Sequence, residues 1–142
     1  MIKRYSNSFR EKALQYIESL PYNVVLRSDL EELGSPRQVS RVLKALLEDG
    51  FLVKLSYGVY AKSEKTPYSD RAIIKIGFTD ACAEALDRLG TDWEVGTAIR
   101  EYNEGKTQQV PVRFTVKLKS RMRRKFVSGK QQLYIEGGMY AR

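Results

Sequence analysis

Residues 35–62, SPRQVSRVLKALLEDGFLVKLSYGVYAK, set a helix pattern directly before a hairpin pattern. The helix pattern opens on Ser35-Pro36-Arg37-Gln38, which fits a capping box, and the proline at the first helical position costs no hydrogen bond. Apolar residues then recur at helical spacing, at Val39, Val42, Leu43, Leu46 and Leu47. This spacing predicts a helix over 36–49 that packs one face into a core.

The hairpin pattern begins directly after Gly50. Residues 51–55 and 59–61 are mostly apolar and are typical of strands, and Ser56-Tyr57-Gly58 between them is a glycine-containing loop of hairpin length. Almost no connector separates the helix from the hairpin, so we expect both in one small domain.

Two shorter helix patterns precede this stretch. A capping box at Ser8-Phe9-Arg10-Glu11 predicts a helix over 9–20, which a proline ends. Another capping box at Ser28-Asp29-Leu30-Glu31 predicts a short helix over 29–33, which a glycine ends. The predicted order is therefore three helices followed by a hairpin.

A boundary is predicted after the hairpin. Residues 63–70 are polar and contain a proline, which is typical of a linker. We therefore expect two domains, the first over 1–63 and the second over 64–142. For a chain of 142 residues, each domain can bury only a modest core.

The second domain is predicted to combine helices with a small antiparallel sheet, which makes the whole chain α+β. An apolar stripe predicts a helix over 78–89, on which Cys82 is expected to be a core thiol, and a capping box opens a further helix over 92–102. Alternating apolar and polar residues over 109–118 predict a half-buried strand. Ser128-Gly129-Lys130 lies between two short strand patterns and predicts a second hairpin.

Positive charge is concentrated in residues 113–130. This segment contains no acidic residue and eight basic ones, Arg113, Lys117, Lys119, Arg121, Arg123, Arg124, Lys125 and Lys130. The chain has 25 basic and 17 acidic residues in all, so the segment carries the whole net charge of +8. Such concentration indicates a polyanionic partner, although a solvated basic face that keeps the protein soluble is the plainer interpretation.

Several classes of protein are excluded or disfavoured. The chain has no histidine and one cysteine, which excludes Ser-His-Asp and Cys-His catalysis and a cysteine-histidine zinc site. It has no glycine-rich phosphate-binding motif. We therefore expect no enzyme, no cofactor and no metal. No apolar run is long enough to cross a bilayer, and residues 1–6 do not resemble a secretion signal, so we expect a cytoplasmic protein without a membrane partner.

Three helices and a hairpin within residues 1–62 are the order of a winged helix-turn-helix. In that fold the third helix enters the major groove of DNA. The face of this helix opposite the apolar one carries Arg37, Arg41 and Lys44 at helical spacing. Arginine can contact guanine through two hydrogen bonds, glutamine can contact adenine in the same way, and lysine or serine can bind phosphate.

The predicted DNA contacts lie on this helix and on the hairpin. The residues expected to touch duplex DNA are Ser35, Arg37, Gln38, Ser40, Arg41 and Lys44 on the helix, with Lys54, Ser56 and Tyr57 on the hairpin. The basic segment is expected to form a secondary surface. Exposed charges on a helix are most often simply solvated, so the prediction depends on the helix order and the two basic regions together.

Short motifs resemble the AbiEi-type antitoxin regulators of bacterial toxin–antitoxin systems. They are Leu26-Arg27-Ser28-Asp29-Leu30, residues 34–41, Leu43, Leu46, Gly50, Gly58-Val59-Tyr60-Ala61 and the later Lys106-Thr107-Gln108-Gln109-Val110-Pro111. The resemblance implies a DNA-binding N-terminal domain that autoregulates its operon and a C-terminal region that neutralises a toxin. It also implies reading residues at Ser35, Arg37, Gln38, Ser40 and Arg41.

The predicted function is a sequence-specific regulator that binds double-stranded DNA and autoregulates a toxin–antitoxin or mobile-element operon. Two alternatives stay open. One is an antitoxin that acts mainly by binding a cognate toxin protein. The other is an RNA-binding protein that uses residues 113–130, with Phe126, Tyr134 and Tyr140 as stacking candidates. A homodimer is compatible with each of these functions.

Overall fold

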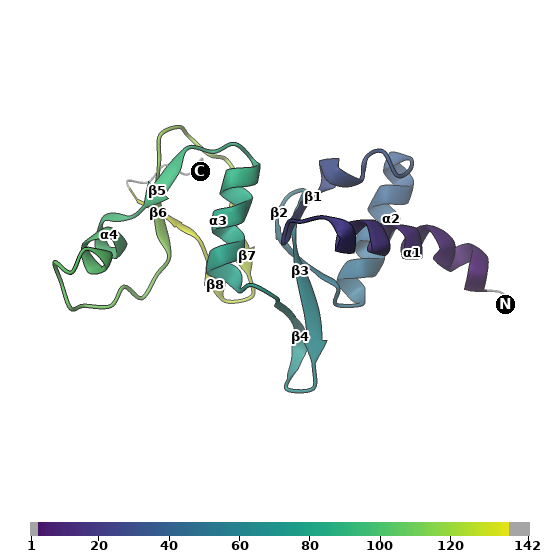
Figure 1. Ribbon diagram of the computed structural model, residues 1–142, viewed down its shortest axis with the longest axis horizontal. Helices are drawn as coiled ribbons and strands as arrows, with labels where there is room; N and C mark the ends of the chain where they lie inside the picture. The colour runs from purple at the N-terminus through teal and green to yellow at the C-terminus, as the bar shows by residue number, and fades with distance from the viewer. Residues whose placement is uncertain (1–2, 137–142) are drawn as a thin grey trace. The chain divides into compact units, whose positions relative to one another are not determined.

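The structure is a computed structural model that describes residues 3–136, with side chains from Phe9 onward, and it has a mixed α+β fold (Figure 1). The described chain forms two compact units. The first contains the residues up to Lys54 together with Gly58–Gly77, and the second contains Leu55–Tyr57 together with the residues from Phe78 on. Among the described residues, no helix has both the length and the apolar character needed to span a membrane.

The first unit combines helices with a four-stranded sheet. Its elements are α1 (Lys3–Ser19), β1 (Val24–Leu26), the 3-10 helix η1 (Arg27–Leu30), α2 (Pro36–Glu48), β2 (Leu52–Ser56), β3 (Val59–Thr66) and β4 (Ser69–Ile74), and the last two residues of β2 belong to the second unit. The strands β1, β3 and β2 lie in that order, and β4 pairs with the far end of β3. In the antiparallel register of β1 and β3, Val24 lies opposite Ala61.

Local chemistry explains where α2 begins. The Ser35 Oγ accepts a hydrogen bond of 3.2 Å from the Gln38 backbone N–H, and the Gln38 Oε1 accepts one of 2.9 Å from the Ser35 backbone N–H. The predicted capping box is therefore confirmed. The apolar face is confirmed too, because Val39, Val42, Leu43 and Leu46 are buried.

The core of the first unit lies between the two helices and the sheet. Buried residues come from α1, β1, η1, α2, β2 and β3, and they are Ala13, Ile17, Val25, Leu30, Val39, Val42, Leu43, Leu46, Leu52 and Tyr60. This core holds the apolar face of α2 inward, so the opposite face of that helix points to solvent.

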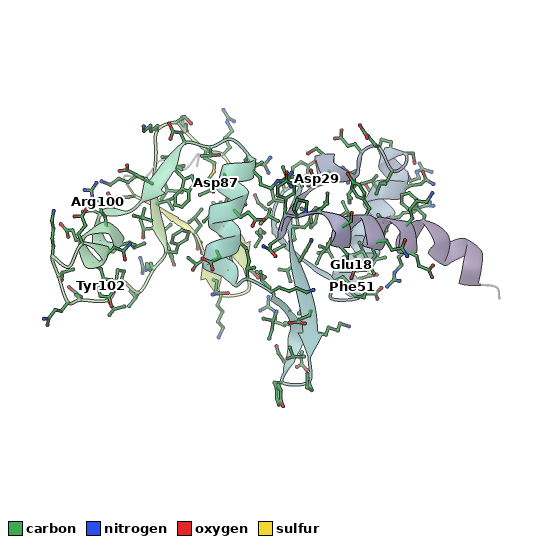
Figure 2. All side chains as sticks on the ribbon, in the orientation of Figure 1. Glu18, Asp29, Phe51, Asp87, Arg100 and Tyr102 are labelled. Carbon is green, nitrogen blue, oxygen red and sulfur yellow. The ribbon has the colours of Figure 1, made fainter. Side chains whose placement is uncertain are left out.

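Two of the capping boxes predicted in the first unit are absent. Helix α1 begins at Lys3, so Ser8 lies inside the helix rather than at its start. In place of a helix over 29–33, η1 begins at Arg27 because the Asp29 carboxylate accepts a hydrogen bond of 2.8 Å from the Leu26 backbone N–H. Asp29 is labelled in Figure 2.

The predicted linker over 63–70 is wrong. Residues on both sides of its proline pair as strands, with Ser63 opposite Ile74 and Thr66 opposite Ser69. The Ser63 side chain is buried and its Oγ donates a hydrogen bond of 3.2 Å to the Gly50 carbonyl. Figure 1 shows β3 and β4 extending beyond the helices of this unit as a hairpin. Apart from Leu55–Tyr57, the residues of the two units divide after Gly77, whereas the sequence prediction divided the chain after residue 63.

The described part of the second unit, up to residue 136, has two helices and two small sheets. Its elements are α3 (Phe78–Arg88), β5 (Trp93–Val95), α4 (Thr97–Asn103), β6 (Thr115–Leu118), β7 (Val127–Ser128), β8 (Gln131–Gln132) and β9 (Tyr134–Ile135). The β7–β8 hairpin confirms the prediction made from Ser128-Gly129-Lys130. The sheet β5-β6-β9 is not purely antiparallel, because β6 and β9 run parallel.

The helix predicted over 92–102 is wrong in its first part. Trp93–Val95 pairs with β6 as a strand, and α4 starts only after Gly96. A side chain at Gly96 would place its Cβ 3.0 Å from the Thr115 side chain. Glycine therefore lets the chain turn closely against β6 before the helix begins.

The strand predicted over 109–118 is correct only at its end. Val116 and Leu118 are buried in β6, as the alternation predicts. Val110 and Val112 are 62% and 95% exposed and lie in an irregular segment. The alternation continues through residues that have no partner strand in the described part of the chain, and without such pairing a period of two does not form a sheet.

Candidate functional site

The exposed face of α2 carries a row of cations. Arg37, Arg41 and Lys44 are all exposed and follow one another at helical spacing, as predicted. Ser40 is exposed beside them. Since the opposite face is buried, these side chains cannot turn inward without unpacking the first unit.

The positive charge of this face lies toward the N-terminal end of α2. At the other end Glu48 is exposed, and Asp49 forms an ion pair with Arg10 of α1. The Arg10 guanidinium also lies 5.8 Å from the centroid of the Phe51 ring, which is labelled in Figure 2. An anion near α2 would therefore be attracted to its first turns and repelled near its end.

Gln38 is exposed, but its side chain already has a structural role. The amide oxygen closes the capping box with the Ser35 backbone N–H. A bidentate contact to adenine requires both the oxygen and the nitrogen of the amide. Gln38 and Ser35 therefore act first as the cap of α2, and a base contact by Gln38 would have to share the oxygen through its second lone pair.

Arg27 holds the start of α2 in place, and sequence reasoning assigned it no such role. Its guanidinium Nη2 donates to the Pro36 carbonyl at 3.0 Å and to the Ser40 Oγ at 2.9 Å. Its backbone N–H donates to the Gly58 carbonyl at 2.9 Å. One residue therefore links the first turn of α2 to the turn between β2 and β3. Its partners lie far along the chain, so no local pattern could have revealed the link.

The predicted hairpin contacts differ in their exposure. Tyr57 is 80% exposed in the turn and Lys54 is exposed on β2. Ser56 is only 8% exposed, so its side chain offers little surface for the DNA contact predicted for it. Gly58 has a φ of +70°, a conformation that side chains disfavour, which explains the glycine in this turn.

Half of the basic segment is engaged within the second unit. Lys117 pairs with Glu136 at 3.4 Å, and Lys119 pairs with Asp92 at 3.6 Å. The Arg124 guanidinium donates to the Tyr57 carbonyl. The Arg113 guanidinium lies 4.7 Å from the centroid of the Tyr134 ring.

The other four cations of the segment have no contact of this kind. Arg121, Arg123, Lys125 and Lys130 are exposed, and none of them forms an ion pair with a described residue. Arg113 and Lys119 are exposed as well, so six of the eight predicted cations can meet a polyanion, and Lys117 and Arg124 are half-buried.

Glu136 is a second residue with a role that the sequence did not indicate. Its carboxylate accepts hydrogen bonds from the Thr97 backbone N–H at 2.8 Å and from the Thr97 Oγ1 at 2.7 Å. The bond from the Thr97 backbone is the largest cause that lowers the pKa of Glu136 below its ordinary value, and Lys117 adds to it. The charged carboxylate thus holds the first residue of α4 against the residue that directly follows β9.

The remaining candidates divide clearly. Cys82 is buried, and loss of hydration raises the pKa of its thiol to about 12, as expected of a core thiol. Phe126 is 0% exposed, which removes it as a stacking surface. Tyr134 is half-buried, and Tyr140 lies outside the described residues.

In the described chain, no group of three or more cysteine, aspartate or glutamate residues is placed to hold a metal ion.

Comparison of the chain with protein-family models, with curated proteins and with solved structures finds no match. The basic face of α2 and the exposed part of the basic segment are the features from which a function can be inferred.

Proposed function

We propose that this chain is a sequence-specific regulator that binds double-stranded DNA through α2, in the manner of a winged helix-turn-helix. The observation that carries the proposal is the exposed row of Arg37, Arg41 and Lys44 on a helix whose opposite face is buried. The regulated operon would be its own, of the toxin–antitoxin or mobile-element kind that the AbiEi-like motifs imply. A toxin partner and a homodimer stay predictions.

The arrangement of the first unit supports this proposal. Its order is α1, β1, η1, α2, β2 and β3, and its sheet places β3 between β1 and β2. In a winged helix-turn-helix the helix before the hairpin is the one that enters the major groove. Here that helix is α2, with the β2–β3 hairpin as the wing.

The chemistry of the α2 face suits duplex DNA. Arg37 and Arg41 lie one turn apart, roughly 5–6 Å between their Cβ atoms, which is a spacing that can address neighbouring base pairs. Lys44 follows on the same face and suits a phosphate. The backbone N–H groups at the start of α2 also favour a phosphate, and Arg27 keeps that start in place.

The test compares Arg41→Ala with a control that removes one positive charge elsewhere. Lys12 is exposed on α1, so Lys12→Ala is the matched control. A duplex selected from a random pool serves as the specific site, and a scrambled duplex serves as the non-specific one. Arg41→Ala should weaken binding to the selected duplex by about 1–3 kcal/mol and leave the scrambled duplex much less affected. Lys12→Ala should change both affinities slightly and equally.

Other outcomes would redirect the proposal. If Arg41→Ala lost the same affinity for the selected and the scrambled duplex, this residue would contact phosphate rather than a base. No loss on either duplex, with the fold intact by circular dichroism, would contradict DNA binding through α2. Tighter binding to single-stranded RNA than to any duplex would favour the RNA-binding alternative.

A further inference from the structure

We propose that the second unit contains a binding site for a nucleoside phosphate. The site is a pocket lined by the start of α3, the irregular segment before β6, and the residues from the β7–β8 turn to β9. Its volume is about 420 Å³, within the roughly 300–1,000 Å³ typical of small-ligand sites. This site is separate from the α2 face and does not depend on it.

The polar lining of the pocket is suited to an anion. It consists of donors and neutral groups, Thr79, Arg113, Lys130, Gln131, Gln132 and Tyr134, and no carboxylate lines the pocket. The guanidinium fork of arginine matches two oxygens of a phosphate, and lysine adds a point charge. An anion bound here would gain these two cations without facing a negative charge in the lining.

The same pocket offers a flat surface for a ring. The Arg113 guanidinium lies 4.7 Å from the centroid of the Tyr134 ring, so the two form a stack. Bases stack well on arginine planes and on aromatic rings. Phe78 and Phe114 add apolar lining, and the amides of Gln131 and Gln132 can donate to and accept from the edge of a base.

A neighbouring pocket gives a useful contrast. It has a volume of about 380 Å³ and shares Val112 and Arg113 with the first, but its lining includes Glu101. A carboxylate there disfavours an anion. The acid-free lining and the Arg113–Tyr134 stack distinguish the first pocket, and together they call for a ligand with both a phosphate and a planar ring.

The protein contains its own reporter for this site. Trp93 is the only tryptophan in the chain, and its ring packs edge-on against Phe114 with centroids 6.3 Å apart. Since Phe114 lines the pocket, a ligand that shifts this ring should change the fluorescence of Trp93. Titration calorimetry on the same samples measures binding even where the fluorescence is insensitive.

The experiment titrates the full chain with adenosine 5′-monophosphate, inorganic phosphate and adenosine. The nucleotide should bind at least about tenfold more tightly than either fragment, because the fragments lose the charged hydrogen bonds or the stacking contact. Arg113→Ala and Lys130→Ala should each raise the dissociation constant of the nucleotide by about tenfold or more. Arg121→Ala removes an exposed charge of the same segment outside the pocket, and it should leave the constant unchanged.

Arg113→Lys tests the ring contact separately. It keeps the charge and removes both the plane and the fork. Inorganic phosphate should therefore bind somewhat more weakly, the nucleotide should lose more affinity than phosphate does, and the advantage of the nucleotide over phosphate should shrink. A short single-stranded oligoadenylate identifies the source of the ligand. Tighter binding of the strand than of the free nucleotide would assign the site to single-stranded nucleic acid, and equal binding would assign it to a free nucleotide.

Three results would overturn the proposal. The first is the absence of nucleotide binding by calorimetry at millimolar concentration. The second is an equal loss of nucleotide affinity for Arg113→Ala and Arg121→Ala. The third is equal affinity of the natural chain for the nucleotide and for inorganic phosphate. The outcome is distinguishable from failure of the DNA-binding proposal, because Arg41→Ala should retain nucleotide binding and Arg113→Ala should retain the preference for the selected duplex.

Discussion

Single residues connect parts of this chain that are distant in sequence. Arg27 joins the start of α2 to the turn between β2 and β3, and Glu136 joins the start of α4 to the end of β9. Both use charged groups to hold backbone atoms at helix starts. Hydrogen bonds to charged groups are stronger than neutral ones, so each residue orients a helix start more firmly than a neutral side chain would.

Glu136 should make stability depend on pH. Its pKa is lower in the folded state than in the unfolded state, so its contribution is fully present above the unfolded pKa and is lost as the pH falls through the folded pKa. We therefore expect Glu136→Gln to lower the melting temperature near neutral pH. As the pH falls through the folded-state pKa of Glu136, the difference in melting temperature between the variant and the natural chain should shrink. Thermal unfolding of both chains across this pH range measures the effect. A constant difference at all pH values would show that the charge of Glu136 contributes nothing.

Cys82 should be unreactive in the folded protein. Its thiol is buried and its pKa is raised to about 12, so the thiolate that reacts with disulfide reagents is scarce at neutral pH. We expect negligible reaction with a thiol-specific disulfide reagent in native buffer and complete reaction in denaturant. Rapid labelling under native conditions would show that α3 opens locally.

At the scale of elements, α2 combines a local start signal with an amphipathic face. The Ser35–Gln38 cap satisfies donors that the first turn would otherwise leave without partners, and the apolar face is held by the core of the first unit. Because the cap and the exposed cations lie on the same turns, the stability of this helix start and its binding surface are linked.

The cap can be measured by substitution. Ser35→Ala should lower the free energy of unfolding by about 1 kcal/mol, and Ser35→Gly by only a few tenths. Ser28 belongs to a predicted capping box that the structure does not contain, so Ser28→Ala is the matched control and should change stability little. Denaturant unfolding of the three variants gives the comparison. An equal loss for Ser28→Ala and Ser35→Ala would contradict the role of the Ser35 cap.

At the scale of the whole molecule, the charge excess is carried by one segment but is only partly accessible. Internal pairing engages Lys117 and Lys119, and Arg124 is bonded to a carbonyl group. The exposed remainder can hold phosphates without reading sequence, which raises affinity and association rate while α2 supplies discrimination.

If the exposed cations of the segment hold phosphates, removing them should change how the affinity for DNA depends on salt concentration. Replacing Arg121, Arg123 and Lys125 with alanine should flatten the slope of log affinity for DNA against log salt by up to about 0.9 per lost phosphate contact. A triple variant of exposed cations in the first unit, at Lys12, Arg71 and Lys75, removes the same charge and should change the slope less. An unchanged slope in the first variant, with the fold intact, would show that these residues do not contact phosphates of the DNA.

The sequence by itself determined the elements whose signals are local. The cap at Ser35, the apolar face of α2, the β2–β3 hairpin and the helix over 78–88 all follow from residue types at fixed spacing within one element. The exposed row of Arg37, Arg41 and Lys44 follows too, because burying one face of a helix exposes the other.

Only the tertiary structure decided the features that depend on distant partners. Residues 63–70 have the composition of a linker but become strands by pairing β3 with β4, and Trp93–Val95 becomes a strand by pairing with β6 in place of helix. Arg27, Glu136 and the Arg113–Tyr134 stack likewise depend on residues that only folding brings near. The physical reason is that strand pairing and side-chain contacts are non-local, whereas helix caps and amphipathic spacing are complete within a few turns of the chain.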